Sequence, residues 1–398
     1  MARAKRLKKT KKIKKNVTRK TASHHEVQDK VTARSKEIKN KLARTITARR
    51  SVELQNGVPF DTAYQRLRAS AEIVFRDKRV RSLGISRHGD SFGYRAVRNS
   101  AMITPESVFQ YETNLRFAND LLSVPVTFID TPHEVEHHLK VPYSGPGSPT
   151  AASSVPEQGR VRPLCTGLQI QNYDDDLRSG VISKGYIVVG TLGCFVKLAD
   201  GSSALLSNNH VVAAENRGKK GSDRILQAGG GAFVLGDQIG VLNDFVELKP
   251  SPPNASVVTG DVVFNDVDAG VVTISDGTQF GQGYHSSRSI SASMRAAPPN
   301  VGDKVFKVGR TTGLTYGHIT DIATIVGPIT YDPGPCWFQG SITVEGDNGT
   351  MFSDKGDSGS VIVRTSGEIL GLLYAGNGQQ TYACTIESVF RALNCNLP

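Results

Sequence analysis

The C-terminal part of the chain alternates short apolar runs with glycine-rich turns, and this pattern limits the available folds more than any other feature. From about residue 160 onward the apolar runs stay short, and the whole chain contains 40 glycines among 398 residues. Such a series is typical of an all-β sandwich or barrel. The predicted strands are 186–198, 232–235, 239–248, 257–264, 269–274, 304–308, 317–326, 337–344, 360–363, 369–374 and 381–386. An apolar stripe over 386–393 predicts a terminal helix.

A serine between two glycines is the first candidate for chemistry. The sequence Gly356-Asp357-Ser358-Gly359-Ser360 precedes an apolar strand. A serine hydroxyl is a poor nucleophile unless the backbone bends so that Oγ projects into a cleft, and glycine permits that bend. Because a glycine–serine turn before a strand is also common in ordinary structure, this segment alone leaves a catalytic and a structural interpretation open.

Two further segments supply a histidine and two acids. Ser207-Asn208-Asn209-His210-Val211 closes an apolar strand, although a lone histidine there is more often a core residue than a base. Asp266 and Asp268 lead into a valine-rich strand. A buried carboxylate requires a partner, because its desolvation costs several kcal/mol. The order His, Asp, Ser, with long gaps, fits three residues that meet only in space.

These features together resemble the trypsin-like (chymotrypsin-fold) serine peptidases. The order of the three residues, the Ser-Asn-Asn-His-Val strand end and the Gly-Asp-Ser-Gly-Ser loop all match. Two more segments, Phe306–Gly317 and Gly190–Gly193, narrow the similarity to the intracellular branch that includes the plant narrow-leaf protein and its bacterial relatives. The resemblance runs from about Arg160 to the C-terminus. It implies a mainly β fold with two six-stranded antiparallel β-barrels and an active site between them.

The resemblance also implies a role for each residue. Ser358 is expected to be the nucleophile, His210 the general base, and Asp268 the acid that orients His210. The backbone N–H groups of Gly356 and Ser358 are expected to form the oxyanion hole. Asp266 is the alternative orienting acid, but the small residues after Asp268 match the family pattern better. Neither a cofactor nor a metal is expected.

Two departures from the secreted digestive peptidases bear on activation and specificity. No Ile-Val-Gly-Gly start follows a cleavage site, so Asp357 is not expected to pair with a new N-terminus. It either pairs with a basic group elsewhere or only shapes the loop. Phe352 lies six residues before Ser358, where the family floors its specificity pocket. An aromatic residue there argues against cleavage after Lys or Arg, although nearby Asp354 leaves that open.

Residues 1–50 are strongly basic. They carry 19 lysines and arginines against three acids, a net charge of about +16, so that residues 51–398 sum to about −5 of the total +11. The run from Lys5 to Lys15 has too few apolar residues to fold alone. Two interpretations stay open. One is a solvated, solubilising arm, and the other is an arm that binds an anionic partner, with nucleic acid ahead of membrane.

A small α/β module is predicted between this arm and the barrels. The predicted domains are a largely disordered or helical basic arm (1–50), the module (51–143), a linker (144–159) and a trypsin-like peptidase domain (160–398). The module is expected to contain a helix over 61–81 with Asp61 as its N-cap. Its other predicted elements are strands at 83–86, 92–97 and 124–129 and a helix at 105–120. The stripe of the first helix is formed by Ala63, Leu67, Ser70, Ala71 and Val74.

Cysteine usage and hydropathy bear on location. Five scattered cysteines without Cys-x-x-Cys spacing predict reduced thiols instead of a zinc site or a disulfide framework. No apolar run approaches the roughly 20 residues of a membrane helix, and the N-terminal segment lacks the apolar core of a secretory signal. We predict an intracellular serine endopeptidase, cytoplasmic or also nuclear in a eukaryote, acting on a protein or peptide. The alternative is a nucleic-acid-associated regulatory or binding protein on a peptidase scaffold with little turnover.

Overall fold

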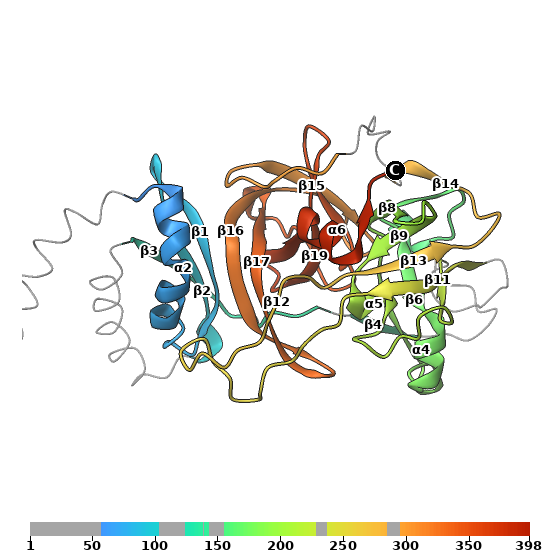
Figure 1. Ribbon diagram of the computed structural model, residues 1–398, viewed down its shortest axis with the longest axis horizontal. Coiled ribbons are helices and arrows are strands. Elements are labelled where there is room, and N and C mark those ends of the chain that lie inside the picture. Colours follow the sequence, from blue (N-terminus) through green and yellow to red (C-terminus); the bar gives the residue numbers. More distant parts are fainter. Residues whose placement is uncertain (1–56, 103–123, 138, 143–154, 228–236, 285–294) are drawn as a thin grey trace, which may run out of the picture. The chain divides into compact units, whose positions relative to one another are not determined.

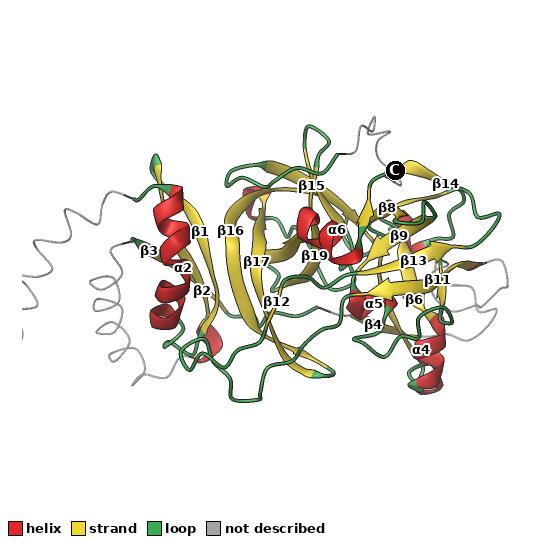
Figure 2. Cartoon of the chain, viewed as in Figure 1, coloured by secondary structure: helices red, strands yellow, loops and turns green. Residues whose placement is uncertain are grey.

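Strands dominate the described part of the chain, as the mainly β prediction requires (Figure 2). The computed structural model describes residues 57–102, 124–137, 139–142, 155–227, 237–284 and 295–398, and residues 57–398 cluster as one unit. The predicted arm (1–50), the predicted helix at 105–120, the predicted strand at 232–235 and most of the predicted linker lie outside these residues. The domain boundaries therefore stay predictions.

The N-terminal and central strands are β1 (Val80–His88), β2 (Ser91–Asn99), β3 (Val126–Thr131), β4 (Leu139–Pro142), β5 (Leu164–Thr166), β6 (Gln169–Asn172), β7 (Tyr186–Thr191), β8 (Cys194–Leu198), β9 (Ser203–Ser207), β10 (Arg224–Leu226) and β11 (Gln238–Phe245). The later strands are β12 (Phe264–Asn265), β13 (Gly270–Ile274), β14 (Phe280–Tyr284), β15 (Lys304–Gly309), β16 (Gly313–Tyr331), β17 (Gly334–Gly346), β18 (Val361–Arg364), β19 (Ile369–Gly376), β20 (Gln380–Thr385) and β21 (Cys395–Asn396). The helices are α2 (Phe60–Val74), α4 (Tyr173–Arg178), α5 (Asn209–Val212) and α6 (Ile386–Leu393).

The described strands that carry the serine segment belong to a ten-stranded sheet. Within it, six strands each pair antiparallel with the next, in the order β15, β16, β17, β20, β19 and β18. Because β18 also pairs with β15, these six strands form a closed cycle. Buried apolar side chains from these strands, among them Val305, Ile342 and Ile362, pack together in one cluster. Ser358 lies in the loop that enters β18.

The histidine and acid segments flank a second, nine-stranded sheet of described strands. In its register β9 pairs with β13, with Ser207 opposite Gly270. β9 ends and β13 begins at the same edge of the sheet. His210 follows β9 and Asp268 precedes β13, so both residues lie near this edge. Strand register alone therefore brings these two segments together, 58 residues apart in sequence.

The predicted N-terminal module extends the first sheet. β1 pairs antiparallel with β16 and with β2, and β3 adds parallel to β2. α2 packs against β1 and β2, and all five residues of its predicted stripe are buried (Figure 1). The predicted N-cap was wrong. Pro59 occupies that position, and Asp61 lies in the first turn, where its charge still favours the positive end of the helix dipole.

Three strand predictions also need correction. The run 257–264 is irregular except for its last residue, because Ser256, Thr259 and Asp261 bond to one another and to nearby backbone, an arrangement that competes with strand pairing. The run 186–198 divides into β7 and β8. β16 continues well past the predicted end at 326, to Tyr331, across several register shifts.

The terminal helix was predicted correctly: α6 spans Ile386–Leu393 and buries Ile386, Val389, Phe390 and Leu393. All five cysteines are free thiols, and four of them are buried. None of the helices in the described ranges is long and apolar enough to cross a membrane.

Candidate active site

His210 lies in the first turn of the short helix α5, directly after β9. Asn208 is the N-cap residue of this helix, and its side-chain Nδ2 donates to the carbonyl of Asp268 at 2.6 Å. Only 2% of His210 is exposed. The backbone of α5 and the side chain of Asn208 therefore hold the segment that carries His210 in place, independently of the contacts of the His210 ring.

The predicted acid pairs with this ring. Nδ1 of His210 lies 2.6 Å from Oδ2 of Asp268, and the backbone N–H of His210 donates to Oδ1 at 3.2 Å. Asp268 is fully buried. The alternative acid, Asp266, is exposed and accepts a hydrogen bond from Gln339. Geometry thus brings Asp268, and not Asp266, to the histidine.

A tyrosine that sequence reasoning missed completes the environment of this carboxylate. The hydroxyl of Tyr331 donates to Oδ2 of Asp268 at 2.9 Å. Burial raises the pKa of Tyr331 well above its usual value, and the nearby carboxylate raises it further. The hydroxyl therefore remains a donor across the physiological range. Tyr331 was missed because the strand predicted to end at 326 runs on to this residue.

The serine loop has the bend that its glycines predicted. Gly356 and Gly359 both have left-handed backbones, with φ of 96° and 95°. A Cβ on Gly359 would come within 2.2 Å of the carbonyl oxygen of Thr191. Thr191 braces the loop in return, since its N–H donates to the Ser358 carbonyl at 2.8 Å and its Oγ1 donates to the Gly356 carbonyl at 2.9 Å.

The partner of Asp357 is Lys307. The two side chains are fully buried, and their charged atoms lie 3.3 Å apart. Oδ1 of Asp357 accepts from the N–H groups of Thr311 and Thr312, and Oδ2 accepts from the Thr312 hydroxyl. Burial lowers the pKa of Lys307, and Asp357 opposes that shift. The structure therefore shows the first of the two alternatives for Asp357, a pair with a basic group elsewhere in the chain.

Ser358 and His210 are not joined by a hydrogen bond in the described residues. Oγ of Ser358 donates instead to the carbonyl of His137 at 2.6 Å, and it also lies 3.3 Å from the carbonyl of Tyr374. Nε2 of His210 is buried and has no hydrogen-bond partner in this part of the chain. Residues near 137 follow no strand or helix pattern, so their place in the site could not be predicted.

His137 is packed beside the predicted base. Its ring stacks on Tyr331, with centroids 3.9 Å apart, and meets the His210 ring edge-on at 5.0 Å. Nε2 of His137 lies 3.1 Å from Oε1 of Glu215. Burial lowers the pKa of His137, while the hydrogen bond with Glu215 opposes this shift. The ring is therefore predominantly neutral at pH 7.

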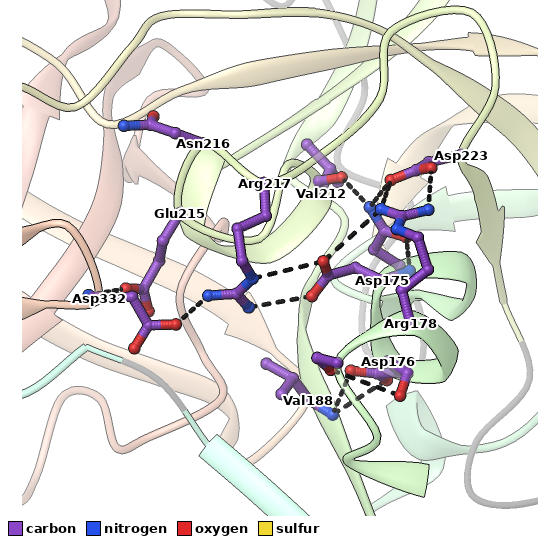
Figure 3. Close-up of polar contacts among 12 residues, drawn as sticks. Asp175, Asp176, Arg178, Val188, Val212, Glu215, Asn216, Arg217, Asp223 and Asp332 are labelled. Atoms are coloured by element: carbon purple, nitrogen blue, oxygen red, sulfur yellow. Dashed lines mark hydrogen bonds and ion pairs between the residues drawn. The ribbon is translucent and has the colours of Figure 1, made fainter.

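A polar network holds Glu215 in place (Figure 3). Oε2 of Glu215 accepts from the N–H of Asp332, whose side chain pairs with Arg217, and Arg217 also reaches Asp175 at 2.9 Å. Ala214, Glu215 and Asn216 all have positive φ. Such residues cost of order 1 kcal/mol each and persist where surrounding contacts fix them. The network supplies those contacts.

A cavity of about 270 Å³ adjoins both Ser358 and His137. Glu136, Lys355 and Gly376 lie on its wall, together with Ser353 and Asp354. Phe352 does not line it. That side chain is 1% exposed and packs in a cluster with Val305, Ile319 and Ile342. The expectation that Phe352 floors the pocket was therefore wrong, because this ring, in the irregular segment before β18, packs into the core.

The serine loop lies in a segment that matches a known family. Residues 288–383 match the Nal1 C-terminal domain. This confirms the resemblance predicted from the sequence. The Nal1 C-terminal match includes Ser358, Lys307 and Tyr331, whereas His210 and Asp268 lie before it. No curated protein sequence matches the chain.

Solved serine proteases are similar in structure at low identity. A Nocardiopsis protease is 18% identical and is matched over 59% of this chain and 98% of its own, with a TM-score of 0.38. A glutamic-acid-specific serine protease gives 18% identity over 59% of this chain and all of its own, with the same TM-score. Cellulomonas bogoriensis chymotrypsin gives 18% over 52% and 90%, with a TM-score of 0.35. Values this low assign no activity to this chain.

Proposed function

We propose that this chain is a serine endopeptidase that uses His210, Asp268 and Ser358. The observation that carries the proposal is the buried His210–Asp268 pair, whose Nδ1–Oδ2 contact of 2.6 Å leaves the other ring nitrogen as a base. A carboxylate at Nδ1 selects the tautomer in which Nε2 holds a lone pair. Tyr331 and the His210 N–H also donate to Asp268, so the orientation of the carboxylate toward His210 is fixed.

The reaction follows from these roles. Oγ of Ser358 attacks the carbonyl carbon of a peptide while Nε2 of His210 takes its proton, and the proton then passes to the departing amine. The N–H groups of Gly356 and Ser358 donate to the oxyanion. Water hydrolyses the acyl-enzyme by the same steps in reverse order. The Lys307–Asp357 pair and the Thr311–Thr312 turn fix the loop that carries these donors.

The scaffold we propose is the two-barrel chymotrypsin type, with six antiparallel strands in each barrel. Support comes from the closed cycle of pairings around β15 to β20 and from the register that joins β9 to β13. An intracellular location is supported by the five free thiols, since a reducing compartment keeps cysteines in this state.

The alternative proposal is a regulatory or binding protein with little turnover, associated with nucleic acid through residues 1–50. Its support is the hydrogen bond from Ser358 Oγ to the His137 carbonyl, which takes the hydroxyl away from His210. The two proposals differ in whether Ser358 is reactive.

A fluorophosphonate probe distinguishes them. We expect covalent labelling at Ser358 that the Ser358→Ala substitution removes, with any turnover falling by about 10⁶. Ser360→Ala is the matched control, because Ser360 is equally buried two residues away and its Oγ only donates to the Asp357 carbonyl. Labelling that survives Ser358→Ala would contradict the assignment. A folded chain that is never labelled would favour the binding protein.

A further inference from the structure

The segment Glu134–His137, here called the strap, pairs with the end of β19 beside Ser358. The N–H of Glu136 donates to the Gly376 carbonyl at 2.8 Å, and the N–H of Gly376 donates to the Glu136 carbonyl at 2.9 Å. This is an isolated antiparallel bridge. An extended peptide that adds to a free strand end makes these same backbone bonds. The strap thus uses hydrogen-bonding groups that a bound peptide would need.

The strap also fills the space beside His210. The His137 ring is 4% exposed and lies against both Tyr331 and His210. Its Nε2 is joined to Glu215, which the network of Arg217 and Asp332 holds in place. A peptide side chain could occupy this space only after His137 had left it.

The strap changes the hydrogen bonding of the proposed nucleophile. Oγ of Ser358 donates to the His137 carbonyl at 2.6 Å, so the hydroxyl proton does not point to the buried Nε2 of His210. Proton transfer to a base requires a hydrogen bond along that path. While the strap is docked, Ser358 and His210 are therefore covered, and the Ser358 hydroxyl is not aligned for proton transfer to His210.

Two glutamates of the strap pair with basic side chains of neighbouring segments. Glu134 accepts two hydrogen bonds from Arg81 of β1, at 2.7 and 3.0 Å. Glu136 forms an ion pair with Lys355, three residues before Ser358, and both of these side chains are about half exposed. An exposed ion pair contributes little. The Glu136 side chain is thus a weak restraint, whereas the two backbone bonds at Gly376 and the packing of His137 are the stronger ones.

We propose that the strap is an internal inhibitor, which occupies the peptide-binding cleft as a substrate strand would and must leave before a peptide is cleaved. This inference rests on the proposed function and adds the regulation of the same site. It also defines the class of competing ligand: an extended peptide with an acidic residue facing Lys355 and a planar side chain following it against Tyr331. The apparent affinity for such a ligand is the intrinsic affinity multiplied by the fraction of molecules in which the strap is displaced.

The test compares probe labelling rates in full-length variants. Glu136→Pro removes the N–H that bonds to Gly376 and leaves His210, Asp268 and Ser358 unchanged. We expect it to be labelled faster than the unmodified chain, on the order of 10-fold. Glu136→Ala is the matched control, because it loses only the exposed ion pair and should be labelled at nearly the original rate. His137→Gly, which removes the ring but keeps the backbone, is a second strap variant expected to accelerate labelling.

A peptide added in trans separates this inference from the proposed function. The peptide has the sequence of residues 131–140, Thr-Pro-His-Glu-Val-Glu-His-His-Leu-Lys, and a scrambled version is its control. It should slow the labelling of Glu136→Pro, and a fluorescent form should bind Glu136→Pro/Ser358→Ala more tightly than Ser358→Ala alone. Binding with no labelling of any folded variant would overturn the proposed function but support the strap. Equal labelling rates in all folded variants, or equal peptide binding in the two backgrounds, would overturn the inhibitor.

Discussion

Lys307 and Asp357 form a fully buried ion pair behind the loop that presents Ser358. Each partner has further hydrogen bonds: Lys307 donates to the Gly313 carbonyl, and Asp357 accepts from the Thr311–Thr312 turn. A charge that is buried on folding is tolerated only with such compensation. The pair gives the loop a counter-charge from within the same folded unit, so loop order does not require a newly cleaved N-terminus.

Removing one member of this pair should disorder the loop. We expect Lys307→Met to lower the free energy of unfolding by about 3–5 kcal/mol, because Asp357 would keep a buried charge without its partner. Lys304→Met is the control, since Lys304 is an exposed residue of the same strand. Thermal melting measures the loss of stability, and probe labelling of Ser358 measures the loss of loop order. Equal melting temperatures for the two variants would contradict a structural role of the pair.

Tyr331→Phe tests the third hydrogen bond to Asp268. The substitution removes the hydroxyl donor and keeps the ring that stacks on His137. Asp268 then loses one of the donors that orient its carboxylate toward His210, so we expect a roughly 10-fold fall in peptidase rate. Tyr316→Phe on the exposed face of the same strand should leave the rate unchanged.

The choice between the two acids has a clear kinetic consequence. Asp268→Asn should lower the rate by about 10⁴ while the protein remains folded, because an amide favours the wrong tautomer of His210. Asp266→Asn should have little effect, since Asp266 is exposed and accepts its hydrogen bond from Gln339. Rate measurements on both variants, with circular dichroism to check folding, decide the matter. The reverse order of effects would transfer the orienting role to Asp266.

Asp176 should make stability depend on pH. It is 2% exposed, and burial raises its pKa to about 7, while the hydrogen bonds from the Val188 N–H oppose the shift (Figure 3). The folded state then binds the proton more tightly than the unfolded state, so stability is lost as pH rises from the unfolded pKa, near 4, toward 7. Asp176→Asn should remove this loss and stabilise the protein above pH 7, by at most about 4 kcal/mol.

Its neighbour provides the control for that measurement. Asp175→Asn replaces a carboxylate that pairs with Arg217, so it should destabilise the protein at neutral pH. Denaturant unfolding of both variants at pH 5 and pH 8 separates the two cases. A stabilisation by Asp176→Asn that is the same at both pH values would contradict the proposed titration.

The basic segment can be tested separately from the peptidase. Deleting residues 1–50 removes a net charge of about +16. If this segment binds nucleic acid, the full chain should be retained on DNA or RNA at low salt and released steeply at moderate salt, because phosphate contacts release counterions. The deleted chain should lose retention and keep probe labelling. Retention that survives the deletion would place the binding surface elsewhere, and no retention of the full chain would favour a solvated arm.

Some features could be predicted from local sequence because local physics determines them. α6 and the buried stripe of α2 follow from apolar spacing, and the bend at Gly356 and Gly359 follows from residues that tolerate positive φ. The pairing of His210 with Asp268 required a long-range inference, which came from the order of residues in a family pattern.

Other site features depend on contacts that no local pattern records. Lys307 appears as one of two lysines in an otherwise apolar strand, and its role is visible only when Asp357 is placed beside it. His137 lies in an irregular segment, and Glu215 lies in a left-handed turn without glycine. The predicted strand at 257–264 failed for the opposite reason, since side-chain hydrogen bonds around Asp261 override an apolar composition.

The position of the strap in the chain has a consequence for how the protein is made. Glu136 and His137 precede His210, Asp268 and Ser358 in sequence, and chains are synthesised from the N-terminus at about 5–20 residues per second. The segment that covers Ser358 is therefore already outside the ribosome when the serine loop emerges. A newly made molecule can close its own cleft as soon as that cleft forms, without waiting for a separate inhibitor to arrive.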